Sequence, residues 1–231
     1  MDLGLYVAAS GMLTEQVRQD QLSNDLANAS TPGYKADETP QHSFGEVLLA
    51  NTEGGQSVGA VNEGVALGKS YTNMTPASLQ ETGEPLDFGI EGNGFFAVQT
   101  AQGVRYTRDG QFMASASGVL TDTNGNPVLD QGGAQVKVGT SGTVEPSALG
   151  TFEVPDASKQ GENLYAGTAA GKAGGSVRQG ALEASGVDAA KVMIEMITSL
   201  RTFQSGQQAI QAIGQTLQEA ASQVGSLNGS G

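Results

Sequence analysis

The sequence predicts an α+β protein, in which long amino- and carboxy-terminal helices pair as a coiled coil and flank a central antiparallel β domain. Three observations predict this fold. Apolar residues recur at helical spacing over residues 3–27 and again over 187–224. Between them, residues 86–154 alternate short strand-like runs with Gly- and Asn-containing turns. The chain has 231 residues, which is enough for one or two compact domains.

The amino-terminal helix is predicted from Leu3 to Ala27. One row of side chains at helical spacing comprises Leu3, Tyr6, Ser10, Leu13, Val17 and Asn24, with Leu5, Met12, Leu22 and Leu26 beside it. Pro32 disfavours helical backbone at Thr31, and Pro32-Gly33 suits the centre of a type II turn. The stretch LSNDLANASTPGY, residues 22–34, carries amides where a solvated helix usually carries Lys and Glu. It is therefore expected to pack against protein.

A longer helix is predicted from Val187 to Val224. Its heptad row alternates spacings of three and four and consists of Met193, Met196, Leu200, Phe203, Gln207, Ile210, Gly214, Leu217, Ala221 and Val224. Ile194, Ile197 and Ile213 widen this row towards a second face. A heptad pattern this long favours pairing with another helix over packing as a single helix on its own domain. Its amide-rich flanks fit a helix with further protein around it, because a paired amide is cheaper to bury than an unpaired charge.

The domain boundaries follow the changes in composition. Residues 1–35 are expected to form the helix of an inner assembly domain, and residues 36–85 an extended linker or outer segment. Residues 86–175 are expected to form the β domain, with Ala101-Gln102-Gly103 as a hairpin connection. Residues 176–231 then form a return segment and the second helix of the assembly domain. The linker is long for a loop in a compact domain, which suggests a surface made to be covered.

Composition excludes several classes of function. The net charge of −13, with only 11 Lys and Arg, argues against binding nucleic acid or an anionic membrane surface. The chain has no cysteine and a single histidine, His42, which removes thiolate and most zinc chemistry. No apolar run is long enough for membrane insertion. The start, MDLGLYVAASGMLTEQ, lacks the basic region of a Sec signal, so any export is expected to use another route.

No pattern of residues indicates catalysis. No nucleophile elbow accompanies His42. Asp122 to Asn126 resembles the start of a calcium loop, but Pro127 and Gly133 occupy positions where that loop needs glycine and glutamate, so a hairpin turn is the better interpretation. We therefore expect no catalytic residue, no cofactor and no metal. A hydrolase using two of the 24 acidic residues stays as a remote alternative.

Three stretches of the chain carry a joint pattern. They are SGMLTEQVRQDQLSNDLANASTPGYK near the amino terminus, GNGFFAVQT with YTRDGQFMASASGVLTDTNGNPVL in the middle, and LEASGVD with MIEMITSLRTFQSGQQAIQAIGQTLQ near the carboxy terminus. Together they resemble the flagellar basal-body rod and hook family of bacterial axial proteins. They cover well over half of the chain in the family's order. Asp25 and Thr202-Phe203-Gln204 depart from the usual pattern and leave the subtype open, between the distal rod and the longer proximal rod proteins.

The resemblance implies a structural subunit and not an enzyme. Such subunits are exported through the flagellar type III export apparatus without a cleaved signal peptide, and they form a helical filament in the basal body, within the cell envelope. The implied partners are further copies of the chain, a homo-oligomer, and other flagellar rod and hook proteins. The assembly interface is expected to contain Leu13, Val17, Leu22, Asn24, Leu26, Asn28, Thr31, Gly33, Tyr34, Met193, Met196, Leu200, Phe203, Gln207, Ile210 and Leu217.

The alternative function is an exported β-rich adhesin or binding module on a coiled-coil stalk. It predicts ligand binding by residues 86–154 alone. Aromatic residues make up only 5% of the chain and tryptophan is absent, which disfavours a platform for stacking sugars.

Overall fold

The structure is a computed structural model that describes the chain except for residues 1, 44–45, 51–56, 63, 162 and 228–231. The chain divides into two compact units. Unit 1 comprises Met1–Asn24, Glu38–Tyr71 and Ala190–Gly231, and unit 2 comprises Asp25–Asp37 and Thr72–Ala189. The terminal helices and a β ribbon belong to unit 1, and most of the β structure belongs to unit 2.

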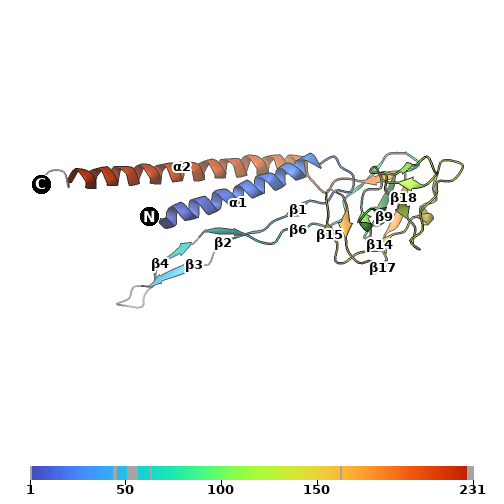
Figure 1. Ribbon diagram of the computed structural model, residues 1–231, viewed down its shortest axis with the longest axis horizontal. Coiled ribbons are helices and arrows are strands. Elements are labelled where there is room, and N and C mark those ends of the chain that lie inside the picture. Colours follow the sequence, from blue (N-terminus) through green and yellow to red (C-terminus); the bar gives the residue numbers. More distant parts are fainter. Residues whose placement is uncertain (1, 44–45, 51–56, 63, 162, 228–231) are drawn as a thin grey trace. The chain divides into compact units, whose positions relative to one another are not determined.

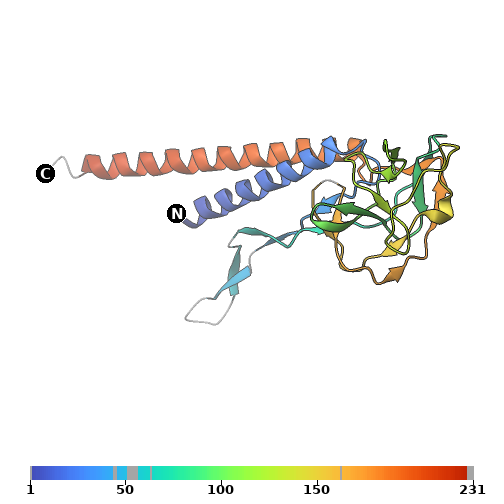
Figure 2. The same ribbon diagram turned by 45° about the vertical axis from the view of Figure 1, so that its right-hand side comes forward.

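Helices α1 (Asp2–Ala27) and α2 (Ala189–Leu227) lie side by side in unit 1 (Figures 1 and 2). They run antiparallel, because Gly4 lies against Ile213 near one end, while Arg18 lies 3.7 Å from Glu195 towards the other. Between these points, the Ser199 hydroxyl donates a hydrogen bond to the Glu15 carbonyl. The predicted pairing of the terminal helices is confirmed.

The face that α2 turns towards α1 differs from the predicted heptad row by one residue at every second position. Met196, Phe203, Ile210 and Leu217 are half-buried, as a packed row requires. Met193, Leu200, Gln207 and Gly214 are exposed instead, and the less exposed positions are their predecessors Val192, Ser199, Gly206 and Ile213. Ser199 and Gly206 are small, so the two backbones approach closely there. The face of α2 that contacts α1 is therefore determined by the small size of these two residues, which the periodicity of apolar residues does not reveal.

The row predicted on α1 is likewise turned outward. Tyr6, Leu13 and Val17 are 58%, 64% and 39% exposed. The side chain of Leu3 lies outside the described residues. The less exposed face of α1 is instead the neighbouring row, with Met12 half-buried and Leu22 buried.

Two glycines of α2 give a matched test of this packing. A Cβ atom at Gly206 would lie 2.8 Å from the Met12 Cγ atom, whereas a Cβ at Gly214 would meet nothing within 4 Å. Gly214→Ala is expected to raise the stability of the helix pair by about 1 kcal/mol through helix propensity. Gly206→Ala is expected to lose that gain to overpacking, which costs about 1–3 kcal/mol. Thermal melting of the circular dichroism signal at 222 nm measures both, and an equal rise in both variants would contradict the packing.

The segment that follows α1, expected to be extended, forms a β ribbon from successive strand pairs (Figure 1). The pairs are β1 (Asp37–Glu38) with β6 (Tyr71–Thr72), β2 (Gln41–Ser43) with β5 (Val65–Leu67), and β3 (Glu46–Ala50) with β4 (Ser57–Asn62). The β2–β5 and β3–β4 pairs are antiparallel. Within unit 1, the Val65 amide donates to the Ser10 hydroxyl, which ties the ribbon to α1.

Unit 2 is an antiparallel β domain. Its elements are β7 (Leu79–Glu81), β8 (Phe88–Glu91), β9 (Phe96–Thr100), β10 (Gly103–Thr107), β11 (Met113–Ala114), β12 (Leu120–Thr121), β13 (Val128–Leu129), η1 (Pro146–Ala148), β14 (Phe152–Glu153), β15 (Ser158–Lys159), β16 (Tyr165–Ala166), β17 (Gly171–Lys172), β18 (Ser176–Gln179) and β19 (Ala181–Glu183). The main sheet has the strand order β13-β9-β10-β16-β15. Strands β9 and β10 pair through the predicted hairpin, with Gly103 opposite Thr100.

Two apolar clusters form the core of unit 2. One gathers around Phe88, Phe96 and Phe112, and the ring centroids of Phe96 and Phe112 lie 5.2 Å apart, edge to face. The other surrounds Phe95 and Tyr165, whose ring centroids lie 5.4 Å apart. Because these buried rings come from several strands, they fix the positions of the loops between those strands.

Candidate assembly surfaces

The helix pair carries apolar side chains on its outward faces. On α2, Met193, Ile194, Ile197 and Leu200 are 50%, 66%, 54% and 46% exposed. Their spacing places them on one face of the helix, opposite the buried Ser199. We call this set the α2 stripe. Clustered exposed apolar side chains of this kind mark surfaces that bind another protein.

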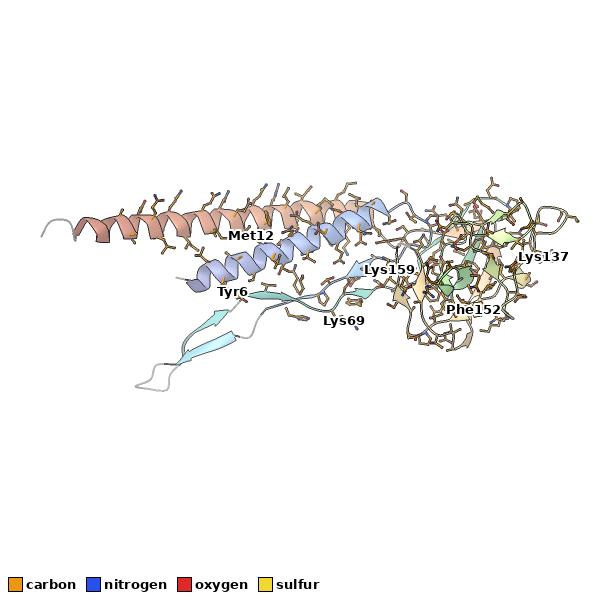
Figure 3. The ribbon with its side chains drawn as sticks, in the orientation of Figure 1. Tyr6, Met12, Lys69, Lys137, Phe152 and Lys159 are labelled. Carbon is orange, nitrogen blue, oxygen red and sulfur yellow. The ribbon has the colours of Figure 1, made fainter. Side chains whose placement is uncertain are left out.

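The outward face of α1 is apolar as well. It presents Tyr6, Leu13 and Val17, which we call the α1 stripe. Figure 3 shows Tyr6 on this helix and Met12 beside α2. The two helices of unit 1 therefore pack on each other through a mixture of small residues, such as Gly206, and half-buried apolar residues, such as Met12 and Phe203, and each leaves a second apolar row exposed.

The residues expected at the assembly interface fall into three groups by exposure. The exposed group is Leu13, Val17, Asn24, Met193, Leu200 and Gln207. Half-buried residues are Leu26, Thr31, Met196, Phe203, Ile210 and Leu217. The buried group is Leu22, Asn28, Gly33 and Tyr34. Only the first group is fully available to a second molecule, and the others hold the surface in shape.

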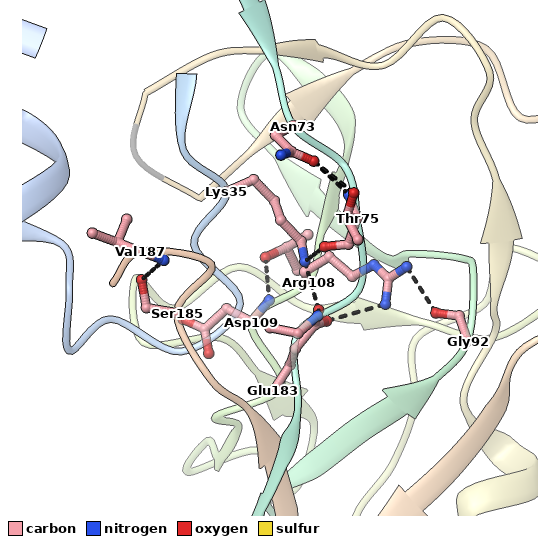
Figure 4. A network of polar contacts seen from close by, with 11 residues as sticks. Lys35, Asn73, Thr75, Gly92, Arg108, Asp109, Glu183, Ser185 and Val187 are labelled. Carbon is pink, nitrogen blue, oxygen red and sulfur yellow. Dashed lines mark hydrogen bonds and ion pairs between the residues drawn. The ribbon is translucent and has the colours of Figure 1, made fainter. Parts of the chain in front are cut away.

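A buried cluster of three charges lies where the chain leaves α1 and where it approaches α2 (Figure 4). The carboxylate of Glu183, at the end of β19, accepts from the Lys35 ammonium at 2.6 Å and from the Arg108 guanidinium at 3.0 Å. The three side chains are 0%, 1% and 3% exposed. Burial lowers the pKa of Lys35, against the opposing effect of Glu183. Lys35 closes the quoted amino-terminal stretch, but sequence spacing gives no sign that it meets residues so far along the chain.

The same cluster is tied to the backbone around it. Lys35 also donates to the Thr75 carbonyl at 2.7 Å, and Arg108 to the Gly92 carbonyl at 2.9 Å. The Ala77 amide donates to the Glu183 carboxylate at 2.7 Å. A buried charge is stable only when it is paired and hydrogen-bonded, so this network fixes the chain segments that contribute to it.

Backbone bonds join the two connecting segments directly. The Gly33 amide donates to the Glu183 carbonyl, and the Gly186 amide donates to the Tyr34 carbonyl, both at 2.9 Å. The Ser185 hydroxyl donates to the Asn28 carbonyl at 2.9 Å. Together with the charge cluster, these bonds form what we call the joint, defined as residues 28–35 and 183–186. The joint holds the exit from α1 beside the approach to α2 within unit 2.

Gly33 satisfies two demands of the joint. Its φ of 68° matches the third position of the predicted type II turn, and the Tyr34 amide donates to the Thr31 carbonyl across that turn. A Cβ atom at Gly33 would also lie 2.4 Å from the backbone of Arg108. The predicted turn is confirmed, and the close approach of Arg108 is a second reason for glycine.

Tyr34 and Asn28 explain the unusual polarity at the end of α1. The Tyr34 hydroxyl donates to the Asp25 carboxylate at 2.9 Å, and the Lys159 ammonium lies 4.0 Å from the centre of the Tyr34 ring. Burial raises the pKa of Asp25, although the Tyr34 bond opposes the shift. The Thr31 hydroxyl donates to the Asn28 side chain. These polar groups are therefore satisfied inside the chain and support the joint.

The half-buried carboxyl of Asp109, in the loop after β10, leads us to expect that the stability of the protein depends on pH. Burial raises its pKa, and the carboxylates of Asp122 and Asp87 add to the rise. A raised pKa means that the folded protein binds the Asp109 proton more tightly than the unfolded chain does. The protonated carboxyl therefore stabilises the fold below about pH 3.8, the ordinary pKa of Asp, and this stabilisation is lost as the pH rises through the pKa of the folded state. Relative to wild type, Asp109→Asn is therefore expected to gain stability between acid and neutral pH. Urea unfolding at several pH values measures this, and a constant difference would contradict it.

The described residues offer no metal site. Among them, no group of three or more His, Cys, Asp or Glu side chains is arranged to hold a metal ion. None of the helices, as far as the structure describes them, is long and apolar enough to cross a membrane. The turn at Asp122 uses its carboxylate to accept from the Asn124 and Asn126 amides, as a hairpin turn does.

Comparison with protein-family models gives three matches along the chain. Residues 5–35 match the model described as flagella basal body rod protein. Residues 89–159 match the flagellar hook protein FlgE/F/G D1 domain, and residues 178–223 match the flagellar basal body rod FlgEFG protein C-terminal. The first and third matches cover most of α1 and α2 and include both halves of the joint.

Relatives that match over nearly the whole chain belong to the same family as these models. The chain is 32% identical to the flagellar hook-basal body complex protein FlhO of Bacillus subtilis, over 97% of this chain and 99% of that protein. It is 31% identical to the flagellar basal-body rod protein FlgF of Caulobacter vibrioides, over 99% of this chain and 100% of that protein. It is also 31% identical to the rod protein FlgG of Bacillus subtilis, over 93% and 96% of the two chains. The chain belongs to the flagellar basal-body rod protein family and is a structural subunit of the rod, not an enzyme.

Proposed function

We propose that this subunit assembles with further copies of itself into a helical filament, through the outward faces of its terminal helices. The observation that carries the proposal is the exposure of the α1 and α2 stripes on a helix pair whose inner face is already packed. The two stripes differ in sequence, so a contact between them on neighbouring copies would be heterologous. Heterologous contacts that do not close into a ring generate helical filaments.

The interface we propose comprises the residues that the sequence predicted. The exposed ones, Leu13, Val17, Met193 and Leu200 among them, would contact neighbouring copies directly. Ile194 and Ile197 belong with them because they are among the most exposed apolar residues of α2. The buried ones, Gly33 and Tyr34 among them, would act through the joint.

Other flagellar rod and hook proteins are the proposed partners at the ends of the filament. We propose a place in the distal rod or among the longer proximal rod proteins, because relatives named FlgF and FlgG match at the same 31% identity. We further propose export through the flagellar type III apparatus without cleavage of the amino terminus. Its support is the match of residues 5–35 to the flagella basal body rod model.

Truncation and imaging test the proposal. Deleting the gene and imaging the basal bodies is expected to show growth that stops at the position of this subunit. Restoring a chain without residues 1–35 is expected to leave growth arrested, because the α1 stripe is absent. The intact chain restores growth and serves as the control. Normal basal bodies containing the truncated subunit would overturn assembly through the terminal helices.

A further inference from the structure

A groove of about 360 Å³ in unit 2 lies beside β11 and is lined by residues 84–87, 111–114 and 123. Its apolar wall includes Leu86, Phe112 and Met113, and Met113 is 50% exposed. Its acidic residues are Glu84, which is exposed, and Asp87, which is only 7% exposed. The groove thus combines an apolar wall with two carboxylates.

Asp87 is the unusual member of this groove. Among the described residues, no group donates a hydrogen bond to its carboxylate and no cation pairs with it. Asp87 and Asp122 both lie near enough to Asp109 to raise its pKa, so negative charge gathers beside the groove. The Asp87 oxygens are not among the fully buried polar atoms that lack a partner, so they keep some contact with solvent and can accept from a charged donor. A cation entering the groove from outside would supply an opposite charge and a hydrogen-bond donor.

The chain itself has cations that are available to fill this role. Six of its Lys and Arg residues form ion pairs within the chain, and Arg105 donates to Gln160. The remaining cations, Lys69, Lys137, Lys172 and Arg201, are exposed, and none has a partner among the described residues. In a chain with a net charge of −13, these few cations are the natural complement to a carboxylate on another copy.

Lys69 fits the groove better than the others. It lies in the irregular stretch between β5 and β6 of the ribbon (Figure 3), and Tyr71 follows two residues later, at the start of β6. Tyr71 is 53% exposed and would cover the apolar wall.

Lys137 and Lys172 lack such a neighbour, because they lie next to Val136 and Ala173, which are buried. Arg201 does have exposed apolar neighbours, Leu200 and Ile197, but these belong to the α2 stripe, which the proposed filament contact already uses.

We propose that this groove receives the Lys69–Tyr71 segment of a second copy of the chain, with the Lys69 ammonium on Asp87 and Glu84 and the Tyr71 ring against Met113. This contact is heterologous and is separate from the helix stripes. It rests on the proposed self-assembly, to which it adds a second point of attachment.

Cross-linking tests the contact cleanly, because the chain contains no cysteine. Two differently tagged chains, one with Thr123→Cys in the groove and one with Ser70→Cys between Lys69 and Tyr71, are mixed, assembled, pelleted and treated with a short thiol cross-linker. Both positions are exposed, and both substitutions keep Lys69, Tyr71, Glu84 and Asp87. Each chain has a single thiol, so a mixed dimer can form only between copies. We expect the mixed dimer to exceed the product of a control with Lys137→Cys in place of Ser70→Cys by about tenfold. Adding Asp87→Asn to the Thr123→Cys chain should remove most of that excess.

The outcomes separate the contact from the assembly. Assemblies that pellet normally but cross-link Ser70→Cys no better than Lys137→Cys would overturn the groove contact and leave the helix-mediated filament standing. An unsubstituted chain that stays monomeric under every condition would overturn both. A mixed dimer that is unaffected by Asp87→Asn would overturn the role of that carboxylate.

Discussion

Glu183→Ala is expected to lower the free energy of unfolding of this protein by about 3–5 kcal/mol. The substitution leaves Lys35 and Arg108 buried with no carboxylate between them, at 1% and 3% exposed. A buried charge that loses its partner retains its full desolvation penalty, which is why removing one member costs more than the pair itself contributes. Urea unfolding followed by tyrosine fluorescence measures the change.

An exposed ion pair provides the control. Arg178 and Glu81 pair on the surface of unit 2 at 51% and 76% exposed. Glu81→Ala is therefore expected to change stability by at most about 1 kcal/mol. If Glu183→Ala and Glu81→Ala had equal effects, the buried cluster would not stabilise the joint as we argue.

Leu13→Glu combined with Ile197→Glu is expected to abolish filament formation while leaving the fold intact. Both side chains are more than half exposed, so neither substitution disturbs the packing between α1 and α2. Each would place a charge in a contact that excludes water, and a central apolar residue of an interface contributes about 2 kcal/mol or more. Association at each substituted contact should weaken by about 30-fold. Sedimentation of purified chains and swimming of the complemented strain measure the loss.

Thr202→Glu is the matched control for this double substitution. Thr202 is exposed and lies about 140° around the helix from Ile197, away from the α2 stripe. The Thr202→Glu variant should therefore sediment and support swimming as wild type does. A double variant that assembled normally would show that the stripes do not face neighbouring copies.

The fold could be predicted from sequence because its signals are local. Helix α1 begins within one residue of the predicted start and ends at the predicted Ala27. The Pro32-Gly33 turn and the hairpin at residues 101–103 follow from the conformations that proline and glycine permit. Each of these signals lies within a few residues, and the structure retains all of them.

The rotation of the helix faces could not be predicted from hydrophobicity. A heptad row selects the largest apolar residues, but in α2 the contact with α1 goes through Ser199 and Gly206, whose small size allows close approach. The larger residues Met193 and Leu200 are exposed on the single chain, where we propose that a neighbouring copy covers them. Under this proposal, the strongest apolar row contributes to the intermolecular face as well as the intramolecular one.

The joint lies beyond sequence reasoning for a different reason. Lys35, Arg108 and Glu183 come from distant parts of the chain, and no periodicity connects them. The sequence holds one indirect indication of the joint. Lys35 follows the tight turn that ends α1, where the chain has to be attached to the rest of unit 2.

The most direct test of the central claim is an electron cryo-microscopy map of a filament or basal body that contains this subunit. The account predicts that Leu13 on α1 and Ile197 on α2, exposed in the single chain, are buried against neighbouring subunits in the map. A map in which these side chains face solvent or the central channel, while other surfaces join the subunits, would contradict it.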